Sequence, residues 1–221
     1  MFQARTDSEA HAPATAGGLV RAAAAELAAR LPRRLSALAT VIPRVRVRGL
    51  AIPLRPPARA HVADAEALCR GRFDFAGTRV ETAGRIVFDV TCDNPDWRRA
   101  LHGFSWLADL LDGDSQLWRI QARAFVSDWF ERRRRLPAEA LEPAVIAERV
   151  TMLVALAPRL LVAAPADFEP LLQRLLAGEF RRLLRSLNGA RRPHERLLVL
   201  IAALGASLAL KGLEGQREQL S

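Results

Sequence analysis

Apolar residues recur with a helical period over most of the second half of the chain. Turn-forming Gly, Pro, Asn and Asp residues interrupt this pattern at regular intervals. The pattern predicts helices over residues 95–111, 115–134, 143–163, 167–187 and 194–212. Because the connections between them are short, we expect successive helices to be antiparallel neighbours.

The first half of the chain is less regular. Residues 1–18 are polar, with Ala, Pro and Gly, which predicts a disordered N-terminus without the apolar core of a secretory signal. Residues 19–70 hold an amphipathic helix (Leu19–Thr40, broken near Pro32), a basic proline-rich connector (Pro43–Pro57) and a short helix (His61–Arg70). The alternation of Val and Arg over residues 45–48 predicts a short edge strand in that connector.

Residues 71–94 change character again. Phe73 and Phe75 alternate with polar residues, Ile86 to Phe88 are apolar, and glycines stand at 77 and 84. This predicts a short β segment with turns. The chain is therefore expected to be mainly α, with a small β-containing N-terminal segment followed by a helical domain over residues 95–221.

The last predicted helix is unusually apolar, since Leu197–Leu210 carries no charge. This run is shorter than the ~20 apolar residues that a membrane span needs. It predicts a fully buried core helix and no membrane span. Gly205 would let another helix approach closely.

The stretch Trp97–Leu111 carries the best candidate for a functional face. On a continuous helix, an apolar stripe that includes Phe104 and Leu107 falls on one side. His102, Ser105, Trp106 and Asp109 fall on the opposite side, around Gly103. A glycine costs ~1 kcal/mol in a helix interior, so something is expected to approach the backbone there. The other interpretation is that these four residues pack and hydrogen-bond against a neighbouring helix.

Two features of the next helix carry simpler interpretations. Trp118, Phe125 and Trp129 share one face, which predicts core, and Asp128 at its border is placed to pair with an arginine. The run Arg132–Arg135 stands at a helix C-terminus, where cations interact favourably with the helix dipole. The simpler interpretation of these arginines is a solvated helix end, and the alternative is that they bind an anionic partner.

Charge and composition limit the partners. The 221-residue chain has a net charge of +9, and Lys211 is its single lysine. Such a charge suits an acidic partner. Because the arginines are dispersed and no recognition motif appears, we do not expect nucleic-acid binding.

The sequence contains no motif for a metal site or a cofactor. Cys69 and Cys92 are too far apart in sequence for a CxxC site, and the four histidines lack HxH or HExxH spacing. Dinucleotide, Walker and GxSxG patterns are absent. We therefore expect no metal and no cofactor.

An ordered series of short segments resembles the N-terminal part of bacterial heparinase II/III-like proteins. The series runs through Gly71–Gly77, Trp97, Leu101–Leu107 and Ala122–Trp129, and continues with Glu142–Val145, Arg149 and the Leu/Ala-rich helix after Pro193. The resemblance covers roughly Gly71 to the end of the chain, and a weaker resemblance covers Arg44–Leu54. It implies an (α/α) toroid whose inner helices face a cleft, so that His102, Ser105, Trp106 and Asp109 become candidates to line a substrate cleft.

The resemblance also implies a chemistry. Members of this family are polysaccharide lyases that cleave uronate-containing chains by β-elimination, with a β-sandwich domain after the toroid. An amide or cation neutralises the uronate carboxylate, a tyrosine or histidine removes the C5 proton, and a tyrosine commonly protonates the leaving oxygen.

This chain departs from that pattern, because it contains no tyrosine and the given sequence ends after one helical block. We expect an incomplete toroid that is inactive as a lyase on its own and binds acidic polysaccharide weakly. Its other partner would be a missing β-sandwich half or a second copy of the chain. The alternative is a non-catalytic helical scaffold or protein-interaction domain. With no signal peptide in view, the default compartment is cytoplasmic, although the family is often periplasmic.

Overall fold

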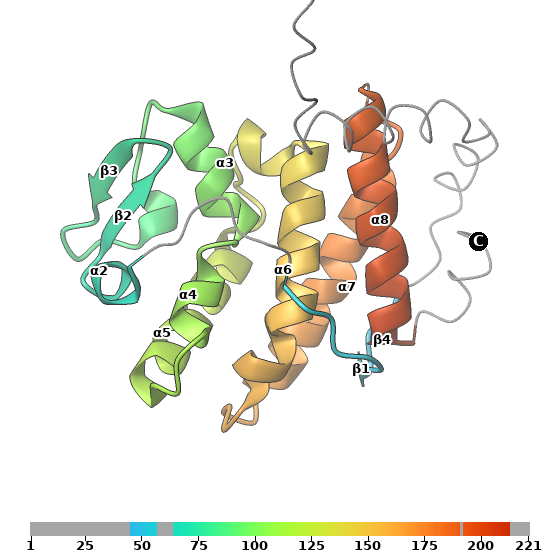
Figure 1. The fold of residues 1–221 in the computed structure, drawn as a ribbon, viewed down its shortest axis with the longest axis horizontal. Helices are drawn as coiled ribbons and strands as arrows, with labels where there is room; N and C mark the ends of the chain where they lie inside the picture. Colours follow the sequence, from blue (N-terminus) through green and yellow to red (C-terminus); the bar gives the residue numbers. More distant parts are fainter. Residues whose placement is uncertain (1–44, 57–63, 191, 213–221) are drawn as a thin grey trace, which may run out of the picture.

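A computed structural model describes residues 45–56, 64–190 and 192–212 of the chain, and the protein in this part is mainly helical (Figure 1). The predicted segment 1–18 and the helix predicted over Leu19–Thr40 lie outside the described residues. The helices are α2 (Ala65–Cys69), α3 (Pro95–Gly103), α4 (Leu107–Leu111), α5 (Gln116–Arg132), α6 (Pro143–Leu161), α7 (Phe168–Ser186) and α8 (Pro193–Ala209). Short 3-10 turns, η2 (Val87–Asp89) and η3 (Ala138–Leu141), precede α3 and α6.

Local sequence signals explain where these helices begin. Asn94 caps α3, because its side chain accepts hydrogen bonds from the backbone N–H groups of Asp96 and Trp97. Proline occupies the first turn of α3, α6 and α8, where its missing N–H costs nothing. Short connections then place α6, α7 and α8 side by side as a group of three helices in mutual contact.

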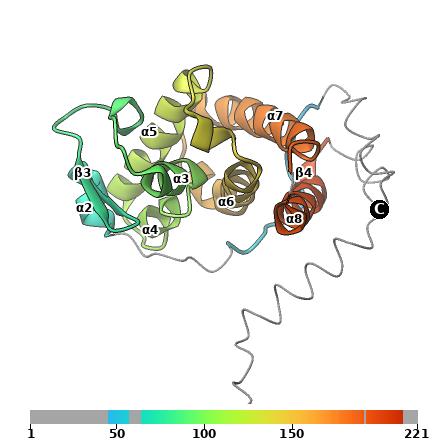
Figure 2. The ribbon, with the colours of Figure 1, turned by 90° about the horizontal axis from the view of Figure 1, so that it is seen from above.

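Helix α6 lies at the centre of the molecule. It contacts α3, α4 and α5 on one side and α7 and α8 on the other (Figure 2). Its sequence is apolar around most of its circumference, and twelve of its residues are buried. A helix that is hydrophobic on nearly all sides belongs in the interior. The core therefore extends around α6 from the aromatic residues of α3–α5 to the leucines of α7.

The predicted β segment is a single hairpin. Strands β2 (Arg72–Phe75) and β3 (Thr78–Glu81) pair antiparallel, with Phe73 opposite Val80. Ala76 and Gly77 both have positive φ, as a tight two-residue hairpin turn requires. Phe73 and Phe75 face the core. The extended structure predicted over Ile86 to Phe88 is wrong, because Asp89 N–H bonds back to the Ile86 carbonyl and forms a 3-10 turn.

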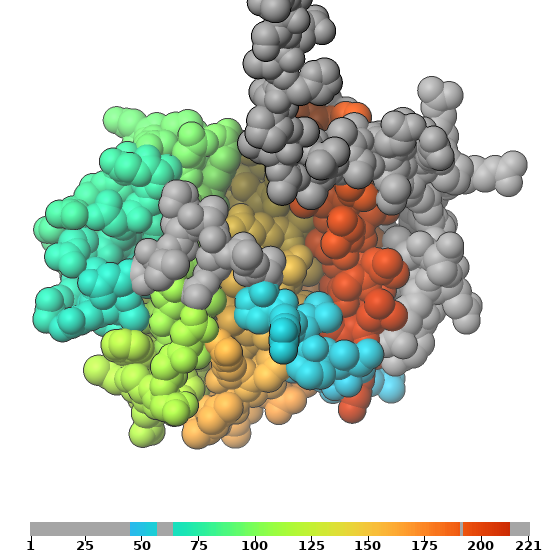
Figure 3. Space-filling view, in the orientation of Figure 1, coloured from blue at the N-terminus to red at the C-terminus, as the bar shows by residue number. Residues whose placement is uncertain are grey.

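The basic connector lies across the α6–α8 side of the molecule (Figure 3). Val45 and Val47 are buried while Arg46 and Arg48 are exposed, so the predicted alternation is confirmed in burial. The strand itself starts later than predicted. Strand β1 (Gly49–Leu50) pairs antiparallel with β4 (Leu210–Lys211), directly after α8.

Helix α8 is not the fully buried core helix that its sequence predicts. Leu198, Ile201 and Leu204 are 48%, 60% and 43% exposed. The prediction failed because charge-free sequence was equated with burial on all sides, whereas only the face with Val199, Ala203 and Ala206 packs inward. The group nearest to a side chain at Gly205 is Leu54 of the connector, not another helix.

Candidate functional site

The candidate face on Trp97–Leu111 does not exist as one helix face. Helix α3 ends at Gly103, Phe104 takes a left-handed conformation with φ of 68°, and α4 starts only at Leu107. Such a conformation is costly for a bulky residue and ends the helix. The continuous helix assumed from periodicity is therefore wrong, and His102 and Trp106 are directed into different surroundings.

His102 lies in a buried polar network, and its side chain is 3% exposed. The indole N–H of Trp129 donates to its Nδ1 at 3.0 Å, which leaves the imidazole proton on Nε2. Burial, followed by the nearby Arg149 charge, lowers the pKa of His102 to about 3, against a smaller opposing effect of Glu139. This histidine is neutral at physiological pH and is held by the core.

Arg149 is the centre of that network and is fully buried. Its Nε and Nη2 both donate to Oε2 of Glu179, at 2.9 and 2.7 Å. The remaining N–H groups reach the carbonyls of His102 and Ala140, and the guanidinium lies over the Trp129 ring at 4.7 Å. Every part of this buried cation therefore has a matched acceptor, as burial of a charge demands.

Trp106 is part of an aromatic cluster instead. It is 3% exposed, and its ring makes edge contacts with Phe73, Phe104 and Phe125. Its indole N–H donates to the Leu101 carbonyl at 3.0 Å. Asp109 is also buried. The partial exposure expected of a cleft face is therefore wrong for His102, Trp106 and Asp109, and only Ser105 is half-buried.

The close approach predicted at Gly103 is confirmed. A β-carbon at this position would collide with Oε2 of Glu148, from α6. Glu148 keeps solvent contact, but desolvation of its carboxylate raises its pKa, while the Ser105 hydroxyl bonds to it and lowers the pKa. A β-carbon at residue 103 would therefore require the end of the Glu148 side chain to move.

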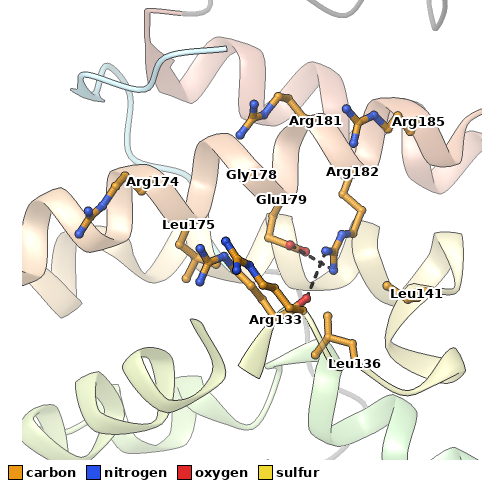
Figure 4. A pocket seen from close by; sticks show the side chains of 11 residues that line it. Arg133, Leu136, Leu141, Arg174, Leu175, Gly178, Glu179, Arg181, Arg182 and Arg185 are labelled. Carbon is orange, nitrogen blue, oxygen red and sulfur yellow. Dashed lines mark hydrogen bonds and ion pairs between the residues drawn. The ribbon is translucent and has the colours of Figure 1, made fainter. Parts of the chain in front are cut away.

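A different region of the molecule concentrates arginines with few carboxylates to pair with them. A cavity of about 480 Å³ lies between the end of α5 and the outer face of α7 (Figure 4). Six arginines line it: Arg133, Arg134, Arg174, Arg181, Arg182 and Arg185. Among the described residues of its lining, Glu179 is the single carboxylate, and it already binds Arg149. We call this lining the arginine groove.

The local sequence explains why the arginines gather here. Helix α7 buries Leu172, Leu176 and Phe180 against the core, so that its arginines fall on the opposite, outer face. Helix α5 ends at Arg132, and the next two arginines then face α7. Arg132 itself turns away to an ion pair with Asp89 at 2.8 Å and a longer one with Asp128 at 3.9 Å. The pairing predicted for Asp128 is thereby confirmed.

The arginines of the groove repel one another. Burial and then the charges of Arg134, Arg174 and Arg182 lower the pKa of Arg133, against a smaller opposing effect of Glu179. Its guanidinium lies over the Phe130 ring at 3.8 Å. The ion pair between Arg182 and Oε1 of Glu179 is long, at 3.5 Å. The side chains of Arg182 and Glu179 point toward Arg133 across the cavity (Figure 4). In the described structure, no ion pair involves Arg174, Arg181 or Arg185.

The residues that line the arginine groove differ from the four candidates on Trp97–Leu111. Sequence reasoning took the run Arg132–Arg135 for a solvated helix end and did not consider α7. A signal was present, because Arg174, Arg181 and Arg185 recur at helical spacing on one face without intervening acids on that face. What sequence could not supply was the position of the α5 end opposite that face.

Metal and membrane sites find no support in the described residues. No group of three His, Cys, Asp or Glu residues there could hold a metal ion, and none of the helices there is long and apolar enough to span a bilayer. Comparisons with protein-family models, with curated proteins and with solved structures give no match to this chain.

Proposed function

We propose that this chain is a helical domain that binds acidic, uronate-containing polysaccharide through the arginine groove. The observation that carries the proposal is the concentration of six arginines around one cavity with a single, already shared carboxylate. Burial and then repulsion by neighbouring arginines lower the pKa of Arg133, and a bound polyanion would relieve the repulsion. Guanidinium groups are well suited to bind carboxylate and sulfate groups through paired hydrogen bonds.

The resemblance to heparinase II/III-like proteins belongs to this proposal, together with the toroid-like arrangement that it implies. The succession of short-connected helices α6, α7 and α8 supports a toroid segment. No catalytic step is included. His102 would be the natural proton acceptor, but it is buried, and its pKa of about 3 makes it a weak base, while the chain contains no tyrosine. We therefore expect binding without β-elimination.

The test is the binding of polygalacturonate to the double variant Arg174→Gln/Arg181→Gln at several salt concentrations. For polyanions, the salt dependence reports the number of ionic contacts, so the slope of log affinity against log salt should fall by about one per lost contact. Both arginines are exposed, so unfolding should not change. The matched control is Arg85→Gln/Arg119→Gln. It removes the same amount of charge at two arginines that do not line the groove.

Two results would count against the proposal. One is equal binding by the groove variant and the control, since net charge alone would then explain the affinity. The other is preference for duplex DNA of the same charge over polygalacturonate, which would make the partner a nucleic acid. Neutral dextran serves as the ligand without charge.

A second candidate function, self-association, is favoured by the exposed apolar face of α8. Leu198, Ile201 and Leu204 fall on one side of the charge-free part of α8. A contiguous apolar face of this kind usually marks an interface or an aggregation risk. Ile201→Glu should lower the sedimentation coefficient at high protein concentration, whereas Leu117→Glu, at an exposed leucine of α5, should not. A wild-type chain that sediments as a monomer at every concentration would exclude this candidate.

A further inference from the structure

The arginine groove continues into a second, larger cavity. This one has a volume of about 730 Å³ and lies between α7 and the basic connector. Arg133, Arg174, Gly178 and Arg181 line both cavities. Arg46 and Arg48 of the connector form its opposite wall, and no acidic residue is among the described residues that line it.

Gly178 stands at the junction of the two cavities. It lies on α7 between Arg174 and Arg182 (Figure 4). No atom lies within 4 Å of the position that a β-carbon would take there, so the space above it is open. Neither packing nor a left-handed φ requires a glycine at this helical position, in contrast to Gly103. An open junction of this kind leaves room for a chain to pass.

The length of the combined surface sets the kind of ligand. Arg174 and Arg185 are eleven residues apart on one helix, which corresponds to about 16 Å along its axis. The connector extends the cationic surface beyond Arg174. A single carboxylate or sulfate would contact one end of this surface only. An extended chain with repeated anions could contact both cavities at once.

We infer that the two cavities form one continuous track for an extended polyanion, in which Gly178 is the passage and the connector is the far wall. The inference rests on the proposed function and adds to it a minimum ligand length. Occupation of both cavities converts the second contact into an intramolecular one, which raises affinity without any new kind of contact. Short fragments should therefore bind weakly, and affinity should rise steeply once a fragment spans the passage.

The connector is fixed at the place where the track needs it. Val45 and Val47 are buried, Arg48 N–H donates to the Lys211 carbonyl at 3.0 Å, and β1 pairs with β4. Arg46 and Arg48, between and beside these anchors, are left exposed. The track is thus built from segments that are far apart in the sequence, the connector and helix α7.

The experiment measures the affinity of galacturonate oligomers, from the monomer to the octamer, for the full chain. We expect affinity to rise at least tenfold between fragments too short to span the passage and fragments that span it. Gly178→Leu should reduce the affinity for the long oligomers at least tenfold, so that oligomers on either side of the spanning length bind alike. Leucine is a good helix former at an open position, so the variant should fold. Gly178→Ala is the control with a small side chain.

A second variant tests the far wall without touching the first cavity. Arg46→Gln/Arg48→Gln should lower the affinity for long oligomers more than the affinity for short ones. The inference is overturned if affinity does not depend on oligomer length, or if Gly178→Leu leaves the long oligomers unaffected. A failure of the proposed function looks different, because then either no oligomer of any length binds, or the Arg174→Gln/Arg181→Gln variant binds all lengths as well as the control variant does.

Discussion

Arg149 and Arg133 are both arginines that burial affects, but Arg149 is fully buried and Arg133 only partly, and their surroundings differ completely. Arg149 is fully buried, and its donors are matched by Glu179 and two backbone carbonyls. Arg133 stands at the surface among three other arginines that lower its pKa. Both regions touch Glu179, whose Oε2 faces the core network and whose Oε1 faces Arg182 in the groove.

This difference separates structural charge from charge that is placed for a ligand. A buried cation must be paired, because an unpaired charge in the interior is very costly. At a surface the same cation tolerates like-charged neighbours, since water screens them. A cluster of arginines without carboxylates is therefore stable enough to persist but gains from any anion that arrives.

The largest expected effect comes from breaking the core network. Arg149→Met should lower the free energy of unfolding by about 3–5 kcal/mol, because it leaves the Glu179 carboxylate buried with only the distant Arg182. Urea unfolding followed by circular dichroism measures this. Arg174→Met, at an exposed arginine of the groove, is the control and should change stability by less than about 0.5 kcal/mol. Equal losses would remove the distinction between the two regions.

A similar effect is expected at Trp106. Because it is buried in the aromatic cluster, Trp106→Ala should cost about 3–5 kcal/mol, as Phe104→Ala should. If Trp106 lined a cleft, as the sequence predicted, its loss would weaken ligand binding and hardly affect stability. A small stability change with loss of polygalacturonate binding would restore that earlier interpretation.

Sequence periodicity placed the long helices well and failed where backbone and burial depend on tertiary contacts. Helices α5 to α8 start and end within a few residues of their predicted bounds, since their breaks carry Pro, Gly or Asp. Helix α3 does end at a glycine, Gly103, but the left-handed residue is the bulky Phe104 that follows it, so a turn at that position could not be predicted. The arginine groove needed the α5 end to meet α7, which only the packing around α6 determines.

Histidine protonation gives a smaller effect on the core side of the comparison. His102 has a folded pKa of about 3, whereas an unfolded histidine titrates near 6.5. Below pH 6.5 the unfolded chain binds a proton at this histidine that the folded chain does not bind. The free energy of unfolding therefore falls as the pH falls. Between pH 7 and 5 this amounts to about 2 kcal/mol.

The measurement compares wild type with His102→Gln, whose carbonyl oxygen can still accept from Trp129. The variant should lack this part of the acid sensitivity, so its stability curve should be flatter between pH 7 and 5. Parallel curves would show that His102 is not kept neutral by the core.

Two glycines give the smallest and most direct contrast between the core and the groove. Alanine is favoured over glycine in a helix interior by about 1 kcal/mol, provided that the methyl group has room. At Gly178 the space is open, so Gly178→Ala should raise the midpoint of thermal unfolding. At Gly103 the carboxylate of Glu148 occupies the space, so Gly103→Ala should lower it. A lower midpoint for Gly178→Ala would mean that the passage above Gly178 is filled, and would argue against the groove as an open track.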